Sequence, residues 1–340
     1  MPRSNHASSS IHAIRSETHL LSLTAIRYTP SNSATILISH IHNSGFEHMI
    51  NGVIVDLITP TQSSGAPDYE TVEVLVDWHV DNGSSALLIG SSTGQSSTMN
   101  IDERTELLRR ALWQADGRIP IIADLGGDNT EHAVELASIA NEYGASAVLI
   151  SAPTKEEAMS KNALLKHFAS LAEAAQLPTL ARAERNHANI LSPIGIAELA
   201  LISGIEGFVD GSTKATSAQE LLKLKLPKGF TLYAGHDTSA YRQMLAGYQG
   251  CISVSANVNP SLLLKLYALA KAGNSVDAEA LDTHLQALHL ALLEDPNSIP
   301  VKWALVEMGC IPEGEHPPTL PQASDYSNLR RALRAAEIPV

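Results

Sequence analysis

The chain has 340 residues, 44% of them hydrophobic and only 4% aromatic, and it carries a formal net charge of −13. So acidic a chain is a poor partner for nucleic acid or for an anionic membrane surface, and no apolar run approaches the ~20 residues that a membrane span needs. The two cysteines, Cys251 and Cys310, lie far apart. They argue against a disulfide framework or a cysteine-based zinc site and favour a reducing compartment, the cytoplasm.

The first fifty residues differ in composition from the rest of the chain. They are rich in serine and histidine, contain Glu17 and Glu47 as their only acids, and carry Arg3, Arg15 and Arg27. This composition is typical of an organellar transit peptide. A disordered extension, or a start codon placed too far upstream, explains it as well, and we favour these two readings. We therefore treat residues 1–50 as an N-terminal extension.

From Gly52 onward, short apolar runs typical of buried parallel strands alternate with segments of helical periodicity. The predicted strands are Val53–Ile58, Ala86–Ile89, Ile119–Ala123, Ala147–Ser151, Thr179–Ala183, Gly207–Val209, Thr231–Ala234 and Cys251–Ser255. The predicted helices are Tyr69–Asn82, Ile101–Ala115, Thr130–Tyr143, Ala163–Ala175 and Ser217–Leu224. Such alternation predicts a closed (β/α)8 TIM barrel over residues 51–259. A doubly wound open sheet is the alternative, which the lack of a glycine-rich dinucleotide fingerprint disfavours.

Residues 260–340 have mainly helical patterns interrupted by proline and glycine, which predicts a C-terminal helical extension. Two helix starts can be named from residue type. Asn100 with Glu103 three residues later is typical of a capping box. Thr130 is predicted to cap the next helix.

Several stretches, taken in chain order, resemble one family of enzymes. The clearest are GVIVDLITP at 52–60, LVDWHVDNGSSALLIGSSTGQSSTMNIDER at 75–104, GCISVSANVNP at 250–260 and IPVKWALVEMG at 299–309. They look like the dihydrodipicolinate synthase / N-acetylneuraminate lyase family over about residues 50–336, and they are most similar to its bacterial dihydrodipicolinate synthases. The resemblance implies a TIM barrel that forms dimers or tetramers. It also implies a lysine on strand six that forms a Schiff base with pyruvate.

The strand-six stretch IEGFVDGSTKA, residues 205–215, lacks that lysine at the expected place. Matching Gly207 and Asp210 to the family pattern puts Val209 in the lysine position. A protonated imine is the electron sink that lets a carbanion form beside it at neutral pH, and valine cannot form one. The resemblance therefore predicts that the usual electrophile is missing.

Other residues that the resemblance implies are also replaced. The tyrosine of strand five falls on Ala181 or Arg182, and a second tyrosine falls near Thr154 or Lys155. The arginine of an Arg-Thr-Gly element falls near Asn186. Together with Val209, these changes predict that the standard mechanism is absent.

One element of the family site is retained, the carboxylate-binding loop. Ser92, Thr93 and Gly94 resemble the family's Thr-Thr-Gly, although the glutamate that usually follows is Gln95. These three residues are the predicted binding site for a small carboxylate.

Four polar residues stand at predicted strand ends where chemistry is done in this fold. They are Asp56, Asp124, Arg182 and His236, with Asp237 beside the last. If they point inward, they form either a salt-bridge network, which we favour, a general acid/base pair, or a divalent metal site. No HxH or HExxH spacing supports the metal, and we expect neither a metal nor a cofactor.

Three functions follow from these observations. We favour a catalytically inactive or diverged barrel that self-associates or co-assembles with an active relative. The second is an enzyme that uses the four polar residues for altered chemistry on a small carboxylate. The third is an active pyruvate-dependent synthase whose lysine is displaced to Lys214 or Lys155, both near predicted strand ends. Lys302 belongs to a segment outside the strand ends and is not considered a substitute.

Overall fold

The computed structural model describes residues 50–127, 129–153, 159–183, 191–212, 215–295, 298–312 and 326–340. The predictions made for residues 1–49, Thr154, Lys155, Asn186 and Lys214 fall outside the described residues.

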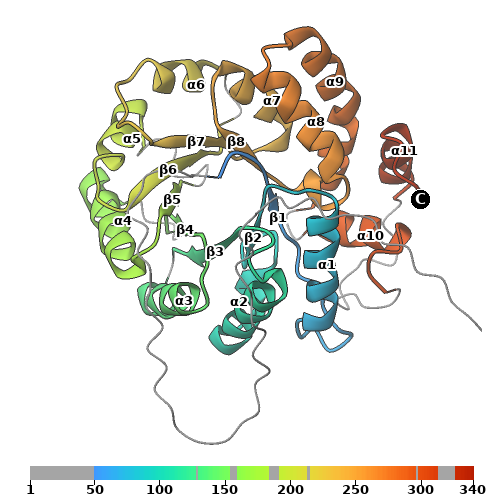
Figure 1. Cartoon of the computed structure of the whole chain (residues 1–340), viewed down its shortest axis with the longest axis horizontal. Coiled ribbons are helices and arrows are strands. Elements are labelled where there is room, and N and C mark those ends of the chain that lie inside the picture. The colour runs from blue at the N-terminus through green and yellow to red at the C-terminus, as the bar shows by residue number, and fades with distance from the viewer. Residues whose placement is uncertain are drawn as a thin grey trace, which may run out of the picture. The chain divides into compact units, whose positions relative to one another are not determined.

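The described residues contain eight parallel strands that close into a barrel in the order β1 to β8 (Figure 1). β8 pairs with β1, with Gly250 opposite Gly52 and Ser253 opposite Val55. This pairing confirms the predicted TIM barrel and excludes the open sheet. The strands are β1 (Gly52–Asp56), β2 (Ala86–Ile89), β3 (Ile121–Gly126), β4 (Ala147–Ser151), β5 (Thr179–Arg182), β6 (Ile205–Asp210), β7 (Thr231–Ala234) and β8 (Gly250–Ser253).

Helices follow the strands and surround the barrel, as the alternation in the sequence predicts. They are α1 (Tyr69–Asp81), α2 (Ile101–Ala115), α3 (Thr130–Glu142), α4 (Lys161–Ala175), α5 (Pro193–Leu199), α6 (Ala215–Leu222), α7 (Asp237–Ala246) and α8 (Pro260–Lys271). Short 3-10 turns, η1 (Ser96–Thr98) and η3 (Ser255–Asn257), follow β2 and β8.

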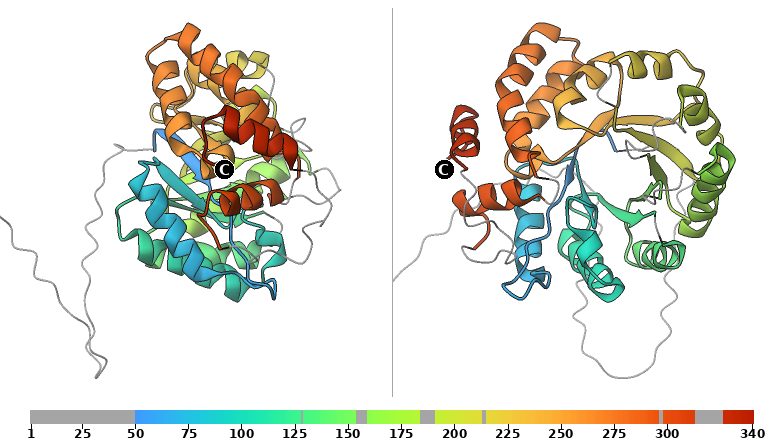
Figure 2. Two further views of the ribbon diagram at one scale, coloured as in Figure 1. Left: turned by 90° about the vertical axis from the view of Figure 1, so that its right-hand side faces the viewer. Right: turned by 180° about the vertical axis from the view of Figure 1, so that it is seen from behind.

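Three further helices confirm the predicted C-terminal helical region: α9 (Ser275–Leu292), α10 (Ile299–Glu307) and α11 (Ser327–Ala335). α9 packs against α7 and α8, and α11 packs against α9 (Figure 2). No helix among the described residues is both long and apolar enough to cross a bilayer.

The two helix starts named from residue type have different outcomes. The Asn100 side chain accepts from the Glu103 N–H at 2.9 Å, and Glu103 accepts from the Asn100 N–H at 2.9 Å, so the capping box is confirmed. The prediction for Thr130 is wrong, because Asn129 caps α3 by accepting from the His132 N–H at 3.1 Å. An asparagine carbonyl is an equally good cap acceptor and lies one residue earlier.

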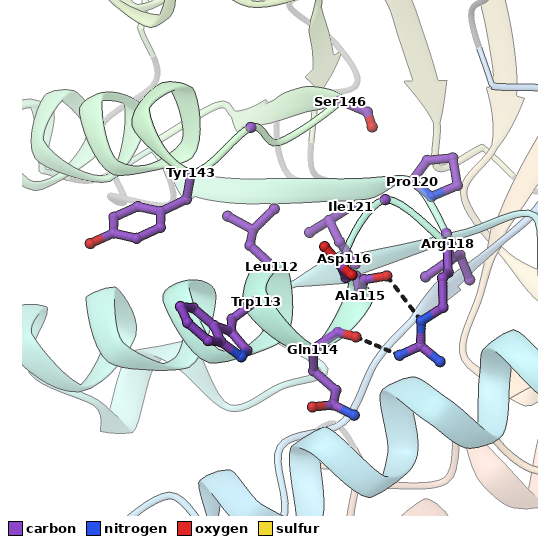
Figure 3. A pocket seen from close by; sticks show the side chains of 13 residues that line it. Leu112, Trp113, Gln114, Ala115, Asp116, Arg118, Pro120, Ile121, Tyr143 and Ser146 are labelled. Atoms are coloured by element: carbon purple, nitrogen blue, oxygen red, sulfur yellow. Dashed lines mark hydrogen bonds between the residues drawn. The ribbon is translucent and has the colours of Figure 1, made fainter. Parts of the chain in front are cut away.

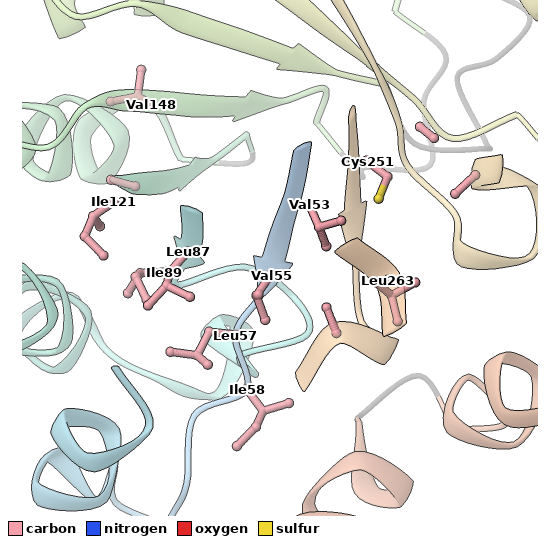
Figure 4. Packing of buried hydrophobic residues seen from close by; sticks show 14 of the residues in the cluster. Val53, Val55, Leu57, Ile58, Leu87, Ile89, Ile121, Val148, Cys251 and Leu263 are labelled. Atoms are coloured by element: carbon pink, nitrogen blue, oxygen red, sulfur yellow. The ribbon is translucent and has the colours of Figure 1, made fainter. Parts of the chain in front are cut away.

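Strand residues alternate between two apolar layers. One set faces outward and packs beneath the helices, as Val53 and Val55 of β1 do near Leu263 of α8 (Figure 4). The other set fills the barrel interior. It consists of Ile54, Ala86, Leu88, Ile122, Ala147, Leu149, Leu180, Val209, Tyr233 and Ile252. The same period of two decides which side chains face inward at the strand ends.

Candidate functional site

The polar residues of the candidate site continue the inward-facing rows of the barrel. Each stands two residues beyond an interior apolar side chain, so the strand pleat turns it toward the barrel axis. The pairs are Ile54 and Asp56, Ile122 and Asp124, Leu149 and Ser151, and Leu180 and Arg182. All four polar side chains therefore meet at the carboxyl ends of the strands.

A small cavity of about 50 Å³ opens among these residues. Asp56, Arg182 and His236 line it, together with Val209. The rest of its described lining is Gly235, Asp237, Ile252, Val254 and Leu293. Its size suits a ligand of a few heavy atoms, far below a drug-sized ligand. Three of the four predicted polar residues thus share one cavity, and the fourth, Asp124, is paired with Arg182.

Arg182 is held in place by an ion pair and by a serine. Its Nη2 atom lies 2.8 Å from Asp124 Oδ2, and the exposed fractions of the two side chains are 15% and 2%. Arg182 also donates from Nε and Nη2 to Ser151 Oγ, at 3.2 and 3.1 Å. Charge-assisted bonds of this kind, largely shielded from water, fix the plane of the guanidinium. A positively charged group is therefore presented to the cavity in one orientation.

Asp56 is bound by two hydroxyls of the loop after β2. Ser91 Oγ donates to Asp56 Oδ1, and Thr93 Oγ1 donates to Asp56 Oδ2 at 2.7 Å. Burial raises the pKa of Asp56 to about 6, while Arg182 and the two hydroxyls oppose the rise and Asp124 adds to it. Asp56 is therefore a carboxyl group that titrates near neutral pH.

The predicted carboxylate-binding loop lies beside this cavity, but its residues differ in exposure. Thr93 is buried and its hydroxyl faces Asp56, whereas the Ser92 side chain is exposed. Gly94 is tightly packed, because a Cβ there would lie 3.0 Å from Thr59 Oγ1 and 3.1 Å from the Leu57 carbonyl oxygen, so these neighbours would have to move by a few tenths of an ångström. A role for Ser92, Thr93 and Gly94 in binding a substrate stays a prediction.

His236 and Asp237 follow β7, as predicted, and stand at the start of α7. His236 Nδ1 lies 2.8 Å from Thr238 Oγ1. Asp237 accepts from the Val254 and Ser255 N–H groups, both at 3.0 Å. Asp237 therefore anchors the turn after β8, while His236 lines the cavity.

Lys302 of α10, which no sequence pattern places near the site, contacts two loops that follow barrel strands. Only 1% of it is exposed, and its Nζ donates to Gln95 Oε1 at 2.6 Å and to Thr61 Oγ1 at 3.4 Å. Burial lowers its pKa to about 8. A lysine in α10 thus reaches the end of the carboxylate-binding loop.

Ser91 and Ser151 were also missed, although the sequence holds a pattern that could have found Ser151. It stands two residues after the interior Leu149, as Asp124 stands after Ile122. Ser91 follows Gly90, whose left-handed backbone (φ 81°) breaks the strand period. The sequence pattern therefore does not show which way the Ser91 side chain points.

A larger hollow lies at the other end of the strands. Leu112, Trp113, Arg118, Pro120 and Tyr143 line it, between the end of α2 and the start of β3 (Figure 3). Catalytic groups in this fold stand at the carboxyl ends of the strands, whereas this hollow adjoins their amino ends. We therefore place the candidate site at the small polar cavity. Among the described residues, no three His, Cys, Asp or Glu side chains are grouped so that they could hold a metal ion.

Residues 49–336 match the model of the Dihydrodipicolinate synthetase family. The chain belongs to this family. The sequences of curated relatives align with this chain over nearly their full length. A 4-hydroxy-tetrahydrodipicolinate synthase of Nitrosococcus oceani is 38% identical over 292 residues, which are 85% of this chain and 99% of the relative. One from Methylococcus capsulatus is also 38% identical, over 85% of this chain and 100% of the relative.

Solved structures of the family have the same fold. A dihydrodipicolinate synthase from Acinetobacter baumannii, complexed with pyruvate, has a TM-score of 0.78 and 34% identity, and the match covers 85% of this chain and all of that one. The enzyme from Thermotoga maritima has a TM-score of 0.79 and 30% identity, over 86% of this chain and 100% of its own.

The prediction of a catalytically inactive or diverged barrel is wrong. Relatives named 4-hydroxy-tetrahydrodipicolinate synthase are 36–38% identical to this chain, and the matches cover 97–100% of their length. The third reading, an active pyruvate-dependent synthase, agrees better with these relatives. The inactive prediction rested on the replacement of the family's tyrosines and arginine and above all on strand six, where Val209 lies in the apolar interior between Arg182 of β5 and Tyr233 of β7. Imine chemistry needs an amine that reaches the carbonyl, and that amine need not stand on this strand. Replacement of the family's catalytic residues stays a prediction.

Proposed function

We propose that this protein is an active synthase that forms carbon–carbon bonds from pyruvate, as a 4-hydroxy-tetrahydrodipicolinate synthase or a near variant. The observation that carries the proposal is 38% identity over 99% of such a synthase. The cavity at the strand ends supports it, because Arg182 offers a fixed positive charge to a small carboxylate.

The reaction proceeds through an imine. A lysine amine attacks the ketone carbon of pyruvate and water leaves. Loss of a proton from the methyl group gives an enamine, whose carbon attacks the aldehyde carbon of a second substrate, and hydrolysis then frees the product and the lysine. We propose Lys214 or Lys155 as the amine. Each follows a strand end by four residues, after Asp210 of β6 and after Ser151 of β4.

The surrounding residues supply binding and proton transfer in this proposal. Arg182 pairs with the substrate carboxylate, Asp124 keeps the guanidinium in place, and the loop of Ser92, Thr93 and Gly94 contributes through Thr93, whose hydroxyl donates to Asp56 in the cavity wall. His236 holds or releases a proton beside the reacting carbons. We further propose a homo-oligomer located in the cytoplasm, as a dimer or tetramer.

Borohydride trapping tests the synthase directly. The full chain is incubated with pyruvate, reduced with sodium borohydride and weighed by mass spectrometry. We expect the mass of one reduced pyruvyl group on one lysine, which peptide mapping then identifies. Lys214→Ala or Lys155→Ala should abolish the adduct, whichever lysine is modified.

Lys302→Met is the matched control, because Lys302 is a buried lysine with no proposed covalent role. It should leave the adduct in place. Absence of any adduct on the wild-type chain over a range of pH and pyruvate concentrations would overturn the proposed function.

A further inference from the structure

The hydroxyl groups around the carboxylate-binding loop already hold a carboxylate that belongs to the chain itself. Ser91 and Thr93 donate to the two different oxygens of Asp56. Only 6% of Asp56 is exposed, and its backbone carbonyl is fixed by Asn257 Nδ2 at 2.7 Å. Asp56 thus accepts the hydrogen bonds that the Ser91 and Thr93 hydroxyls could otherwise donate to a ligand. It does so from the wall of the cavity in which a ligand would bind.

The charges around Asp56 disfavour the binding of a second anion. Arg182 faces it from β5, but Arg182 is already paired with Asp124 of β3. His236 and Asp237 at the start of α7 also line the cavity. The remaining described walls near it, Val209, Ile252 and Val254, carry no charge. Arg182 is thus the only permanent cation among the described lining residues, and it faces two acids, Asp56 and Asp124.

We propose that Asp56 is a specificity-determining residue, an internal carboxylate that competes with the substrate carboxylate for the Ser91 and Thr93 hydroxyls and for Arg182. A carboxylate ligand then binds only when Asp56 is protonated or has turned away. This inference rests on the proposed function, since it takes pyruvate as the ligand. Its physical basis is that two carboxylates cannot share the same donors in a water-poor site without strong repulsion.

Binding of the ligand is consequently coupled to uptake of a proton. Because the pKa of Asp56 lies at about 6, the carboxyl is mostly ionised at pH 7.5 and mostly neutral at pH 5. Each pH unit above that pKa should weaken carboxylate binding by about tenfold, the slope for one linked proton.

Calorimetric titration of the full chain with pyruvate tests the competition. Wild type should bind at least about tenfold more weakly at pH 7.5 than at pH 5.5. At pH 7.5 it should take up close to one proton per ligand, measured in buffers of different ionisation enthalpy. Asp56→Asn keeps the shape and removes the charge. It should bind pyruvate at pH 7.5 at least about tenfold more tightly than wild type, with a flat pH profile.

Asp210→Asn is the matched control. Asp210 is another buried strand-end aspartate, but its carboxylate accepts from Tyr248 at 2.7 Å and Gln243 at 3.1 Å, away from the cavity. Its replacement should leave the pH dependence of pyruvate binding unchanged. Circular dichroism establishes that each variant is folded.

Three results would overturn the inference: equal affinity of wild type and Asp56→Asn at pH 7.5, a flat profile in wild type, or no pyruvate binding by either protein. Trapping separates this inference from the proposed function. Tighter, pH-independent binding by Asp56→Asn without any borohydride adduct supports the competition and overturns the synthase. An adduct in both proteins with the same dependence on pyruvate and pH supports the synthase and overturns the competition.

Discussion

At the scale of single residues, the candidate site is dominated by the cost of burying charge. Asp56 accepts two hydroxyl hydrogen bonds and faces a guanidinium, yet burial still raises its pKa from 3.8 to about 6. Desolvation therefore outweighs the partners that favour the charged form. Such a residue weakens the fold when it is ionised, and sites that bind or react commonly contain residues of this kind.

This cost predicts a pH-dependent difference in stability between wild type and Asp56→Asn. The pKa of Asp56 is higher in the folded chain than its usual value of 3.8, so its favourable contribution is complete below about pH 4 and is lost as the pH rises through 6. Asp56→Asn lacks this loss. We expect the variant to be more stable by about 1–3 kcal/mol at pH 8 and close to wild type at pH 4. Urea unfolding at pH 4 and pH 8 measures this difference in the free energy of unfolding. A difference that does not change with pH would contradict desolvation of Asp56 as the cause.

Much of this site could be predicted from residue type and strand period. The sequence predicts that Asp56, Arg182 and His236 share one space, and the cavity joins them because inward positions recur every second residue. Ser151 was missed because a serine has little hydropathy signal. The contact of Lys302 with Gln95 spans 207 residues, and no local pattern reports a contact between such distant segments.

At the scale of elements, α10 is joined to the loop after β2 by one buried lysine. Lys302 enters from the first turn of α10, and its ammonium has an amide and a hydroxyl as its described partners at Gln95 and Thr61. Neutral acceptors compensate desolvation of a cation only in part, and burial accordingly lowers the pKa of Lys302 to about 8. The link therefore fixes the loop at a cost in stability.

Gln95→Glu should remove that cost, because the new carboxylate has the same reach and opposite charge to Lys302. We expect a gain of about 1–2 kcal/mol at pH 7, where the lysine is charged. The lowered pKa means that the penalty is present below pH 8 and disappears as the pH rises toward 10.5, so the gain should shrink in the same range.

A double-mutant cycle with Lys302→Met isolates the pair. In the Lys302→Met background, Gln95→Glu should give no stabilisation, since the charge that it pairs with is gone. Equal effects of Gln95→Glu in both backgrounds would show that the gain comes from elsewhere in the loop.

At the scale of the whole barrel, closure depends on the pairing of the first and last strands. The alternation of apolar runs and helices predicts eight units, but periodicity alone cannot state that the eighth strand returns to the first. In the structure Gly250 of β8 lies opposite Gly52 of β1, and the Gly52 N–H donates to the Gln249 carbonyl at 3.1 Å. Two glycines face each other at the seam because the backbones approach closely there.

Gly250→Ala should therefore damage the whole fold. A Cβ at this position would lie 2.1 Å from the Gly52 carbonyl oxygen and 2.9 Å from its nitrogen, and backbone atoms cannot move aside as a flexible side chain can. We expect a loss of at least about 3 kcal/mol in the free energy of unfolding, or failure to accumulate as soluble protein.

Gly273→Ala is the control, since Gly273 has φ of 72° but no atom within 4 Å of the added Cβ. It should cost only about 1 kcal/mol, the strain of a left-handed alanine. Urea unfolding compares the two, and equal losses would mean that the seam between β1 and β8 can widen without loss of barrel closure.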